Sequence, residues 1–367
     1  MPILSDEERH PEGMGMNERI RRGAGIALAV AAVWLGAALL PAPRAAFAGE
    51  LPSAAMEAGA AAQERILIPG GQVVGVALHT QGVLVVAQTP REGIKSALRV
   101  GDVILSAQGQ EINSVQMLSD AVNAAQTDTV ELHVLRRGKA ITVQAAVPED
   151  SADGRRRLGV WARDSTAGVG TLSYIDPVTQ AYGALGHAIV DGDTGDMVTV
   201  RDGAIMRADV IGVTRGASGA AGELKGSFLK AGEQIGTLAR NSASGIYGRM
   251  DALPQNLLYP QGLPMGAPGD VHEGPATIIS TVDHGGPVEY TVEILSCEDS
   301  ATASRRDMTL QVTDARLLAK TGGIVQGMSG SPIIQDVKLV GAVTHVLVND
   351  PTRGYGIFIE NMLDAAE

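Results

Sequence analysis

Cysteine and aromatic residues are almost absent from this chain. Among its 367 residues there is 1 cysteine, and Phe, Trp and Tyr together make up 3%. The single Cys297 excludes an internal disulfide, and we expect a free, buried thiol at this position. No histidine stands beside it in a matching motif, which argues against a cysteine nucleophile.

Positive charge is also scarce. The 29 Lys and Arg residues face 41 Asp and Glu, which gives a net charge of −12. This balance argues against nucleic acid and against an anionic lipid surface as a main partner. Glycine, in contrast, is abundant (46 residues), and apolar residues make up 45% of the chain. Such a composition favours many short strands joined by glycine turns over a helical bundle, in two or three domains.

The N-terminal residues are arranged like a secretory signal. Three arginines precede the apolar run Ala24–Leu40, two prolines end that run, and the small residues Ala46–Ala48 stand before Gly49. This order of a basic, an apolar and a small-residue region predicts a signal in residues 1–48, either cleaved or kept as a membrane anchor. A small-residue linker follows at 49–65. We therefore expect the protein to be exported.

Short strands, one helix and a hairpin follow over residues 66–148. A helix is expected from Val115, with apolar residues spaced along one face, and a hairpin turns at Arg136–Lys139. Together with the segments "GGQVVGVAL" and "LRVGDVILSAQGQEI", these elements resemble a PDZ domain. An alternative is a PDZ fold that serves only as a scaffold.

The PDZ resemblance implies a binding site for a peptide. In that family a glycine-rich loop binds a C-terminal carboxylate through backbone N–H groups, and the peptide adds a strand to the sheet. The residues that correspond to this loop are Gly71, Gln72, Val73, Val74 and Gly75. The expected ligand is therefore a peptide or a protein tail.

A charged stretch, 148–159, marks the next boundary, and residues 149–367 read as a second domain. From Val160 onward at least seven strand-like runs alternate with glycine turns, which predicts a barrel or a sandwich. A Pro- and Gly-rich stretch at 250–275 is expected to connect two halves. The predicted fold class is therefore mainly β.

The stretch "GGIVQGMSGSP" places Ser329 between glycines, just before an apolar run. A serine becomes a nucleophile when a base takes its proton and when nearby backbone N–H groups can bind the oxyanion. Gly327 and Gly330 allow the tight backbone that such a turn needs. Taken alone, the stretch is equally consistent with an ordinary turn between strands.

Six histidines in the exported region are candidate bases. His79 and His133 lie in the PDZ-like block, and His272 and His284 lie in polar loops without a pattern. His345 falls within an apolar strand, where a packed histidine on a sheet face is expected. The remaining one, His187, lies between small residues after a turn, in the open setting that a catalytic base needs.

Two long motifs give the chain a specific resemblance. "YIDPVTQAYGALGHAIVDGDTG" and "TGGIVQGMSGSPIIQDVKLVGAVTHVLVNDPTRGYGIFIENML", behind a PDZ-like block and an N-terminal apolar segment, resemble the SpoIVB peptidase family. The resemblance implies a serine endopeptidase with a chymotrypsin-like β-barrel domain that acts in sporulation. It further implies export into the space between the two forespore membranes. The resemblance implies that the enzyme cleaves itself there and then a membrane-bound regulator, which leads to activation of a late sigma factor.

The resemblance also assigns catalytic roles. It implies Ser329 as nucleophile, His187 as base and Asp314 as the acid that orients the imidazole. The N–H groups of Gly327 and Ser329 are the expected oxyanion donors. Asp191 and Asp193 are rivals for the acid, although both lie so close to His187 in sequence that loop roles suit them better.

Neither a cofactor nor a metal is expected, because no His, Cys, Asp or Glu cluster shows ligand spacing. The expected partners are a membrane-bound protein substrate and a peptide tail at the PDZ domain, without nucleic acid. Two other functions stay open on sequence grounds. One is an inactive exported PDZ adaptor, and the other is an envelope quality-control protease, in which the PDZ domain usually follows the catalytic domain.

Overall fold

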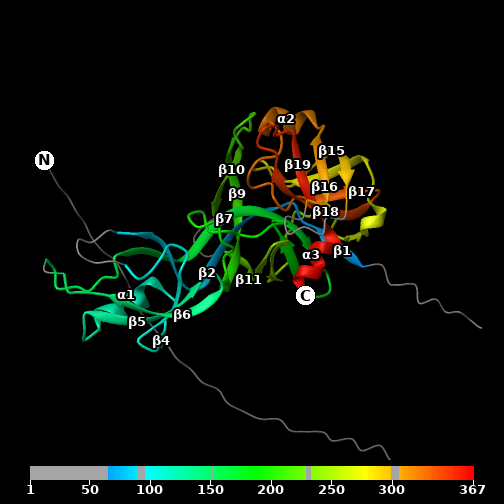
Figure 1. Ribbon diagram of the computed structural model, residues 1–367. Helices are drawn as coiled ribbons and strands as arrows, with labels where there is room; N and C mark the ends of the chain where they lie inside the picture. The colour runs from blue at the N-terminus through cyan, green and yellow to red at the C-terminus, as the bar shows by residue number, and fades with distance from the viewer. Residues whose placement is uncertain (1–64, 90–95, 151, 229–232, 299–305) are drawn as a thin grey trace, which may run out of the picture. The chain divides into compact units, whose positions relative to one another are not determined.

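The computed structural model describes residues 65–89, 96–150, 152–228, 233–298 and 306–367 (Figure 1). The predicted signal, and the linker up to residue 64, lie outside this described part. Within it, no helix combines the length and the apolar character needed to cross a membrane. The described chain is mainly β, as predicted, with strands gathered into barrels and a PDZ-like unit.

The first barrel closes through a ring of antiparallel pairings. Its strands are β2 (Val73–Gln88), β7 (Val160–Ile175), β8 (Ala181–Ala184), β9 (Val200–Thr214), β11 (Gln234–Ser242) and β12 (Gly245–Met250). β2 pairs with β7, and the ring then continues through β8, β12, β11 and β9 back to β2. Apolar side chains that alternate along these strands, such as Val74, Val76 and Leu78, fill the interior.

The PDZ-like unit is inserted within the first barrel. It contains β3 (Val103–Ala107), β4 (Gln110–Glu111), α1 (Val115–Asn123), β5 (Thr129–Arg136) and β6 (Lys139–Ala146). Its core also takes Val83 and Val85 from the second half of β2, with Val160 and Ala162 at the start of β7 packed against it. The predicted helix and the β5–β6 hairpin are confirmed, and Ser114 caps α1 by accepting a hydrogen bond from the N–H of Met117 (3.1 Å).

The insertion changes the predicted domain boundary. Residues 66–80 were assigned by sequence to the PDZ domain, but Ile68, Val74 and Leu78 pack in the core of the first barrel. β1 (Ile66–Pro69) pairs with β7 and with β13 (Leu263–Pro264), so the strand before β2 also belongs to the barrel side. The barrel therefore begins before the PDZ-like unit and resumes after it.

The second barrel is closed by six antiparallel strands. These are β14 (Gly274–Ser280), β15 (Val288–Cys297), β16 (Met308–Val312), β19 (Arg353–Phe358), β18 (Lys338–Val346) and β17 (Pro332–Gln335), in that order around the barrel. The Pro- and Gly-rich stretch 250–275 joins the two barrels, as predicted, and contains the short η1 (Pro268–Asp270). Cys297 is a free thiol, and it is only partly buried.

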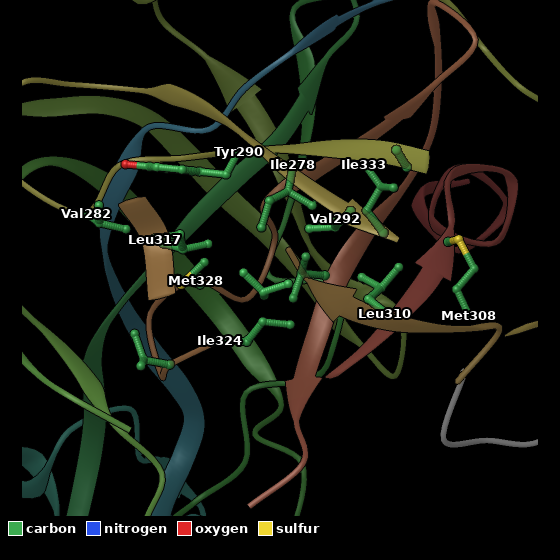
Figure 2. Close-up of a cluster of buried hydrophobic side chains, with 14 of the residues drawn as sticks. Ile278, Val282, Tyr290, Val292, Met308, Leu310, Leu317, Ile324, Met328 and Ile333 are labelled. Atoms are coloured by element: carbon green, nitrogen blue, oxygen red, sulfur yellow. The ribbon is translucent and has the colours of Figure 1, made fainter. Parts of the chain in front are cut away.

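Three further elements complete the described chain. β10 (Glu223–Phe228) pairs with β9 as an antiparallel hairpin arm. Its first residue, Glu223, also forms an isolated parallel β-bridge with Gln326, in the loop before Ser329. α2 (Ala315–Thr321) and α3 (Ile359–Ala366) accompany the second barrel. Leu317 of α2 joins Ile278, Val292, Leu310 and other apolar side chains in the barrel core shown in Figure 2.

Candidate active site

The Ser329 turn is anchored by its neighbours. Met328 is fully buried, and Figure 2 shows its side chain among the apolar residues of the second barrel, near Leu317 and Ile324. Gly330 has φ +98°, and a Cβ there would lie 2.1 Å from the carbonyl oxygen of Thr171. A side chain at this position is therefore excluded, and the glycine lets the turn pack closely against β7.

The turn before His187 is equally constrained. Leu185 has φ +70° and Gly186 has φ +68°, so two successive residues adopt the left-handed conformation. For a bulky side chain such as leucine this backbone costs on the order of 1–3 kcal/mol and must be imposed by its surroundings. The buried Leu185 side chain supplies that constraint by packing in the first-barrel core. Strain of this kind is concentrated at functional sites, which directs attention to His187.

A cavity of about 520 Å³ brings these two turns together. Ser329 enters it from the second barrel and His187 from the first. The remaining wall includes Val169 of β7, Ala221 just before β10 and Val346 at the end of β18. The structure thus places the predicted nucleophile and the predicted base in one site, although they are far apart in sequence.

Hydrogen bonds define the resting state of both side chains. The Ser329 hydroxyl donates to the carbonyl oxygen of Thr344 (2.6 Å). His187 Nδ1 lies 2.8 Å from the carbonyl oxygen of Ala188, and because a carbonyl only accepts, Nδ1 must carry the proton. The other ring nitrogen, Nε2, then holds a lone pair. Burial lowers the pKa of His187 below its ordinary value of 6.5, so the ring is a neutral base at pH 7.

The predicted oxyanion donors make no hydrogen bond in the described structure. Around them, the N–H groups of Met328, Gly330 and Ser331 donate to backbone carbonyls. Within the described part of the chain no acceptor is found for the N–H groups of Gly327 and Ser329. Both N–H groups are therefore unused in the turn that carries the serine hydroxyl, and stabilisation of a tetrahedral oxyanion needs donors of this kind.

His345, which sequence reasoning left as a packed strand residue, lies at the rim of the same cavity. Its ring centroid is 4.9 Å from that of His187, with a tilt of 36° between the rings. The protein around the ring partly desolvates it, and this effect, with contributions from His187 and Arg306, lowers the pKa of His345 to about 4, although the residue as a whole is exposed. His345 is therefore uncharged near neutral pH and faces His187 as a second neutral imidazole.

Asp314 lies elsewhere. It is the N-cap of α2, where its carboxylate accepts from the N–H groups of Arg316 (2.8 Å) and Leu317 (3.3 Å). It also pairs with the Arg316 guanidinium (2.7 Å), and this hydrogen bond is the main reason that its pKa falls to about 2. Asp314 is not among the residues that line the cavity of His187, so the structure does not bring these two predicted triad members together.

The rival acids are also engaged elsewhere. Asp191 accepts hydrogen bonds from the N–H groups of Asp193 and Thr194 (3.0 Å each) and lies 3.2 Å from Arg163. Asp193 pairs with the same arginine. In the described structure the group that orients the His187 ring is the carbonyl of Ala188, a backbone partner that no residue motif could have revealed.

Comparison with known proteins identifies the peptidase domain. The family model for SpoIVB peptidase S55 matches residues 154–363, more than half of the chain. The chain belongs to this family. It is therefore a serine endopeptidase, and a PDZ family model matches residues 72–147. No curated protein matches the chain.

Two solved structures are similar to parts of this peptidase. The PDZ domain of the SdrC-like protein from Listeria monocytogenes is 21% identical, with a TM-score of 0.20, and the match covers 22% of this chain and 87% of that one. The inactive form of the Rv3671c protease is 14% identical, with a TM-score of 0.31, and that match covers 54% of this chain and 84% of the other.

The position of Asp314 leads to a first prediction. We expect Asp314→Asn to leave the kcat of the peptidase within a few-fold of wild type, because asparagine is as good an N-cap as aspartate and His187 is held by a backbone carbonyl. The free energy of unfolding should fall only slightly, because the hydrogen bonds that weaken are those with the exposed guanidinium of Arg316. Steady-state kinetics and urea unfolding measure both quantities. A loss of kcat near the 10⁴-fold expected of a triad acid would return Asp314 to the triad.

The predicted peptide-binding loop needs correction. Gly71 donates its N–H to the carbonyl of Leu172 (2.8 Å), and Val73–Gly75 pair with β7 residues 169–171. On the other side, Val74 and Gly75 pair with β9. These backbone groups are thus used inside the first barrel, with β-strands on both sides, and they cannot receive a peptide.

A groove beside α1 has an open strand edge and a glycine loop, the two features that a peptide-binding site of this kind needs. Its volume is about 750 Å³, and it runs between Val115, Leu118 and Val122 of α1 and the start of β7. Trp161 on that strand is 68% exposed. Over residues 160–163 β7 pairs with β2 on one side, and no described strand pairs with its other side.

The loop before this strand spans Arg155–Gly159 and ends in a glycine, as does the loop Gly71–Gly75 that the sequence predicts as the peptide-binding loop. Gly159 adopts φ +67°, and its carbonyl accepts from the N–H of Thr89 (2.8 Å). Within the described residues no acceptor is found for the N–H groups of Leu158 and Gly159. The sequence signal for this site is "GRRRLGV", which overlaps the charged stretch that predicts a domain boundary at 148–159.

No group of three or more His, Cys, Asp or Glu residues within the described ranges could hold a metal ion. His272 illustrates how the other histidines are used, because it pairs with Asp336 (2.9 Å) on the surface. His79 likewise pairs with Asp202 (2.7 Å).

Proposed function

We propose that this chain is an exported serine endopeptidase of sporulation, which cleaves itself and then a membrane-bound regulator. That cleavage leads through intramembrane proteolysis to activation of a late sigma factor, in the space between the two forespore membranes. Membership of the peptidase family supports the proposal, as do the two long motifs that carry the resemblance. The observation on which it rests is one cavity that unites Ser329, His187 and two unused backbone N–H groups.

The proposed mechanism follows from these groups. Ser329 Oγ turns from the Thr344 carbonyl toward Nε2 of His187 and attacks the substrate carbonyl as the imidazole takes its proton. The N–H groups of Gly327 and Ser329 bind the oxyanion of the tetrahedral intermediate. The protonated His187 then gives its proton to the leaving amine, while Ala188 holds the ring in one tautomer through Nδ1.

The arrangement of the barrels supports a chymotrypsin-like assignment. Both barrels have six antiparallel strands, and the base comes from the first while the nucleophile comes from the second. The walls of the site come from both barrels, so residues of both surround a bound substrate. The difference from the usual triad is the backbone carbonyl that takes the place of the acid.

We further propose that the α1 groove binds the carboxyl-terminal tail of a protein partner. An extended peptide can add a strand to the unpaired edge of β7 at residues 160–163, with its carboxylate at the N–H groups of Leu158 and Gly159. Its side chains would rest on the apolar face of α1 and on Trp161. The groove would then hold a membrane-bound substrate close to the protease without taking part in the chemistry.

The groove proposal predicts a binding loss in Trp161→Ala. An exposed tryptophan in a groove is a typical binding hot spot, so the affinity for peptides should fall roughly 10-fold or more. Ile211→Ala is the matched control, because Ile211 is 60% exposed on β9 of the first barrel. Fluorescence anisotropy with a pool of seven-residue peptides, carrying either a free or an amidated C-terminus, measures the affinity. Equal affinities for Trp161→Ala and wild type, or no preference for the free carboxylate, would contradict the groove as a tail-binding site.

The cellular role is tested by complementation of a spore-forming bacterium that lacks its own peptidase of this family. We expect the wild-type chain to restore self-cleavage, cleavage of the membrane-bound regulator and late sigma-factor activity. Ser329→Ala, produced at the same level, should restore none of them. If Ser329→Ala restores the late sigma factor, or if the wild-type chain leaves the regulator intact, the sporulation role is wrong.

A further inference from the structure

Among the described residues, the lining of the cavity around Ser329 contains no Asp, Glu, Lys or Arg, although 19% of the whole chain is charged. Its two histidines both have pKa values lowered by desolvation, so they are neutral near pH 7. A substrate side chain that enters this cavity therefore contacts no charged side chain among the described lining residues.

Aliphatic side chains form the part of the wall closest in sequence to the nucleophile. Ile324 and Val325 are 2% and 1% exposed, and they lead directly through Gln326 to Gly327. Val346 follows Thr344 and His345 at the end of β18, and all three line the same cavity. The two segments border the place where the substrate carbonyl must lie.

This geometry determines which substrate side chain enters the cavity. The carbonyl under attack has its oxygen at the N–H groups of Gly327 and Ser329. The side chain of the same residue is attached one bond away, at the neighbouring Cα, and so projects beside the wall that precedes Gly327. The residue just before the scissile bond is therefore the one that contacts Ile324 and Val325.

We infer that this peptidase selects an uncharged aliphatic residue immediately before the bond that it cleaves. This inference rests on the proposed function of Ser329 and adds a substrate class to it. An aliphatic side chain gains by leaving water for an apolar wall. A lysine or glutamate side chain would lose its hydration without gaining a partner charge, and such burial is strongly unfavourable.

The test compares covalent probes that differ in one side chain. Peptidyl diphenyl phosphonates react when the serine oxygen displaces phenol at phosphorus, and they can carry a leucine-like, a lysine-like or a glutamate-like side chain at the selected position. We expect the leucine-like probe to inactivate the full-length enzyme on the order of 10²-fold faster than either charged probe. A small fluorophosphonate without a peptide, measured in parallel, reports the reactivity of Ser329 itself.

A matched variant sharpens the comparison. Gln326→Glu keeps the shape of an exposed side chain at the rim but adds one negative charge. It should raise the rate of the lysine-like probe relative to the leucine-like probe by roughly 3- to 10-fold, and it should slow the glutamate-like probe further. Gln110→Glu, on exposed β4 of the PDZ-like unit, is the control and should change neither ratio.

The outcomes separate the inference from the proposed function. If the fluorophosphonate labels Ser329 but a charged probe reacts as fast as the leucine-like one, the selectivity is wrong while the peptidase assignment stands. Unchanged ratios in Gln326→Glu would contradict the placement of the side chain beside this wall. If no probe, peptidyl or small, labels Ser329, the proposed function fails and the inference fails with it.

Discussion

Replacement of Ser329 by alanine should abolish peptide-bond cleavage and leave the fold intact. The hydroxyl makes one hydrogen bond, to the carbonyl of Thr344, and its removal leaves Met328 and the glycines of the turn in place. Loss of a serine nucleophile from a working site lowers kcat by roughly 10⁶-fold. The free energy of unfolding should change by only about 1 kcal/mol. Turnover of a peptide substrate and urea unfolding measure the two effects.

Ser331 offers the control for this prediction. It lies two positions along the same turn, is fully buried, and donates its hydroxyl to the carbonyl of Met328 (2.7 Å). Ser331→Ala should therefore cost stability and keep substantial activity. If Ser331→Ala is inactive while Ser329→Ala still cleaves at the wild-type rate, the nucleophile has been assigned to the wrong serine.

The second large effect is expected at His187. His187→Ala should lose activity about as completely as Ser329→Ala, and the double variant should be no worse than either single one, because the two side chains act as a unit. His345→Ala is the matched control. It removes the neighbouring ring at 4.9 Å but leaves the Ala188 hydrogen bond to His187 in place. Single-turnover kinetics with one peptide substrate compare the three single variants and the double variant. An additive loss in the double variant would show that His187 acts apart from Ser329.

The pH dependence of the wild type provides an independent check on His187. The base acts in its neutral form, and burial lowers its pKa, so activity must fall as the pH drops through a value below 6.5. At pH 7 the enzyme should already lie on its plateau. An acid limb of kcat/KM centred above 6.5 would contradict a buried, neutral His187 as the base.

Some features of the fold follow from local sequence alone. The spacing of Val115, Leu118 and Val122 predicts α1, and the Arg136–Lys139 turn predicts the β5–β6 hairpin, because both depend on contacts close along the chain. The division into domains does not. β2 and β7 each run for 16 residues, with one end in the first barrel and the other end in the PDZ-like unit. Apolar residues continue along each strand where its side chains leave one hydrophobic core and enter the other, so the sequence does not mark the domain boundary.

The residues of the site also divide into those that local sequence reveals and those that only the folded structure reveals. Ser329 and His187 could be found because tight turns and small neighbouring residues are visible in the sequence around each of them. The family resemblance implies Asp314 as the acid, whereas its local context, an aspartate directly before "ARLL", suits an N-cap. His345 was missed because a register shift between Val343 and Val346 interrupts the alternation of β18 on either side of it. The Ala188 carbonyl is a backbone group, and only coordinates can place it.

The central claim is that Ser329 is a nucleophile activated within a cavity shared by both barrels. The most direct test is to incubate the full-length protein with a fluorophosphonate probe and to locate the adduct by mass spectrometry of its peptides. We expect one adduct, on Ser329, that disappears in His187→Ala and persists in Asp314→Asn. An adduct on another serine, or labelling of Ser329 that is unaffected by His187→Ala, would contradict it.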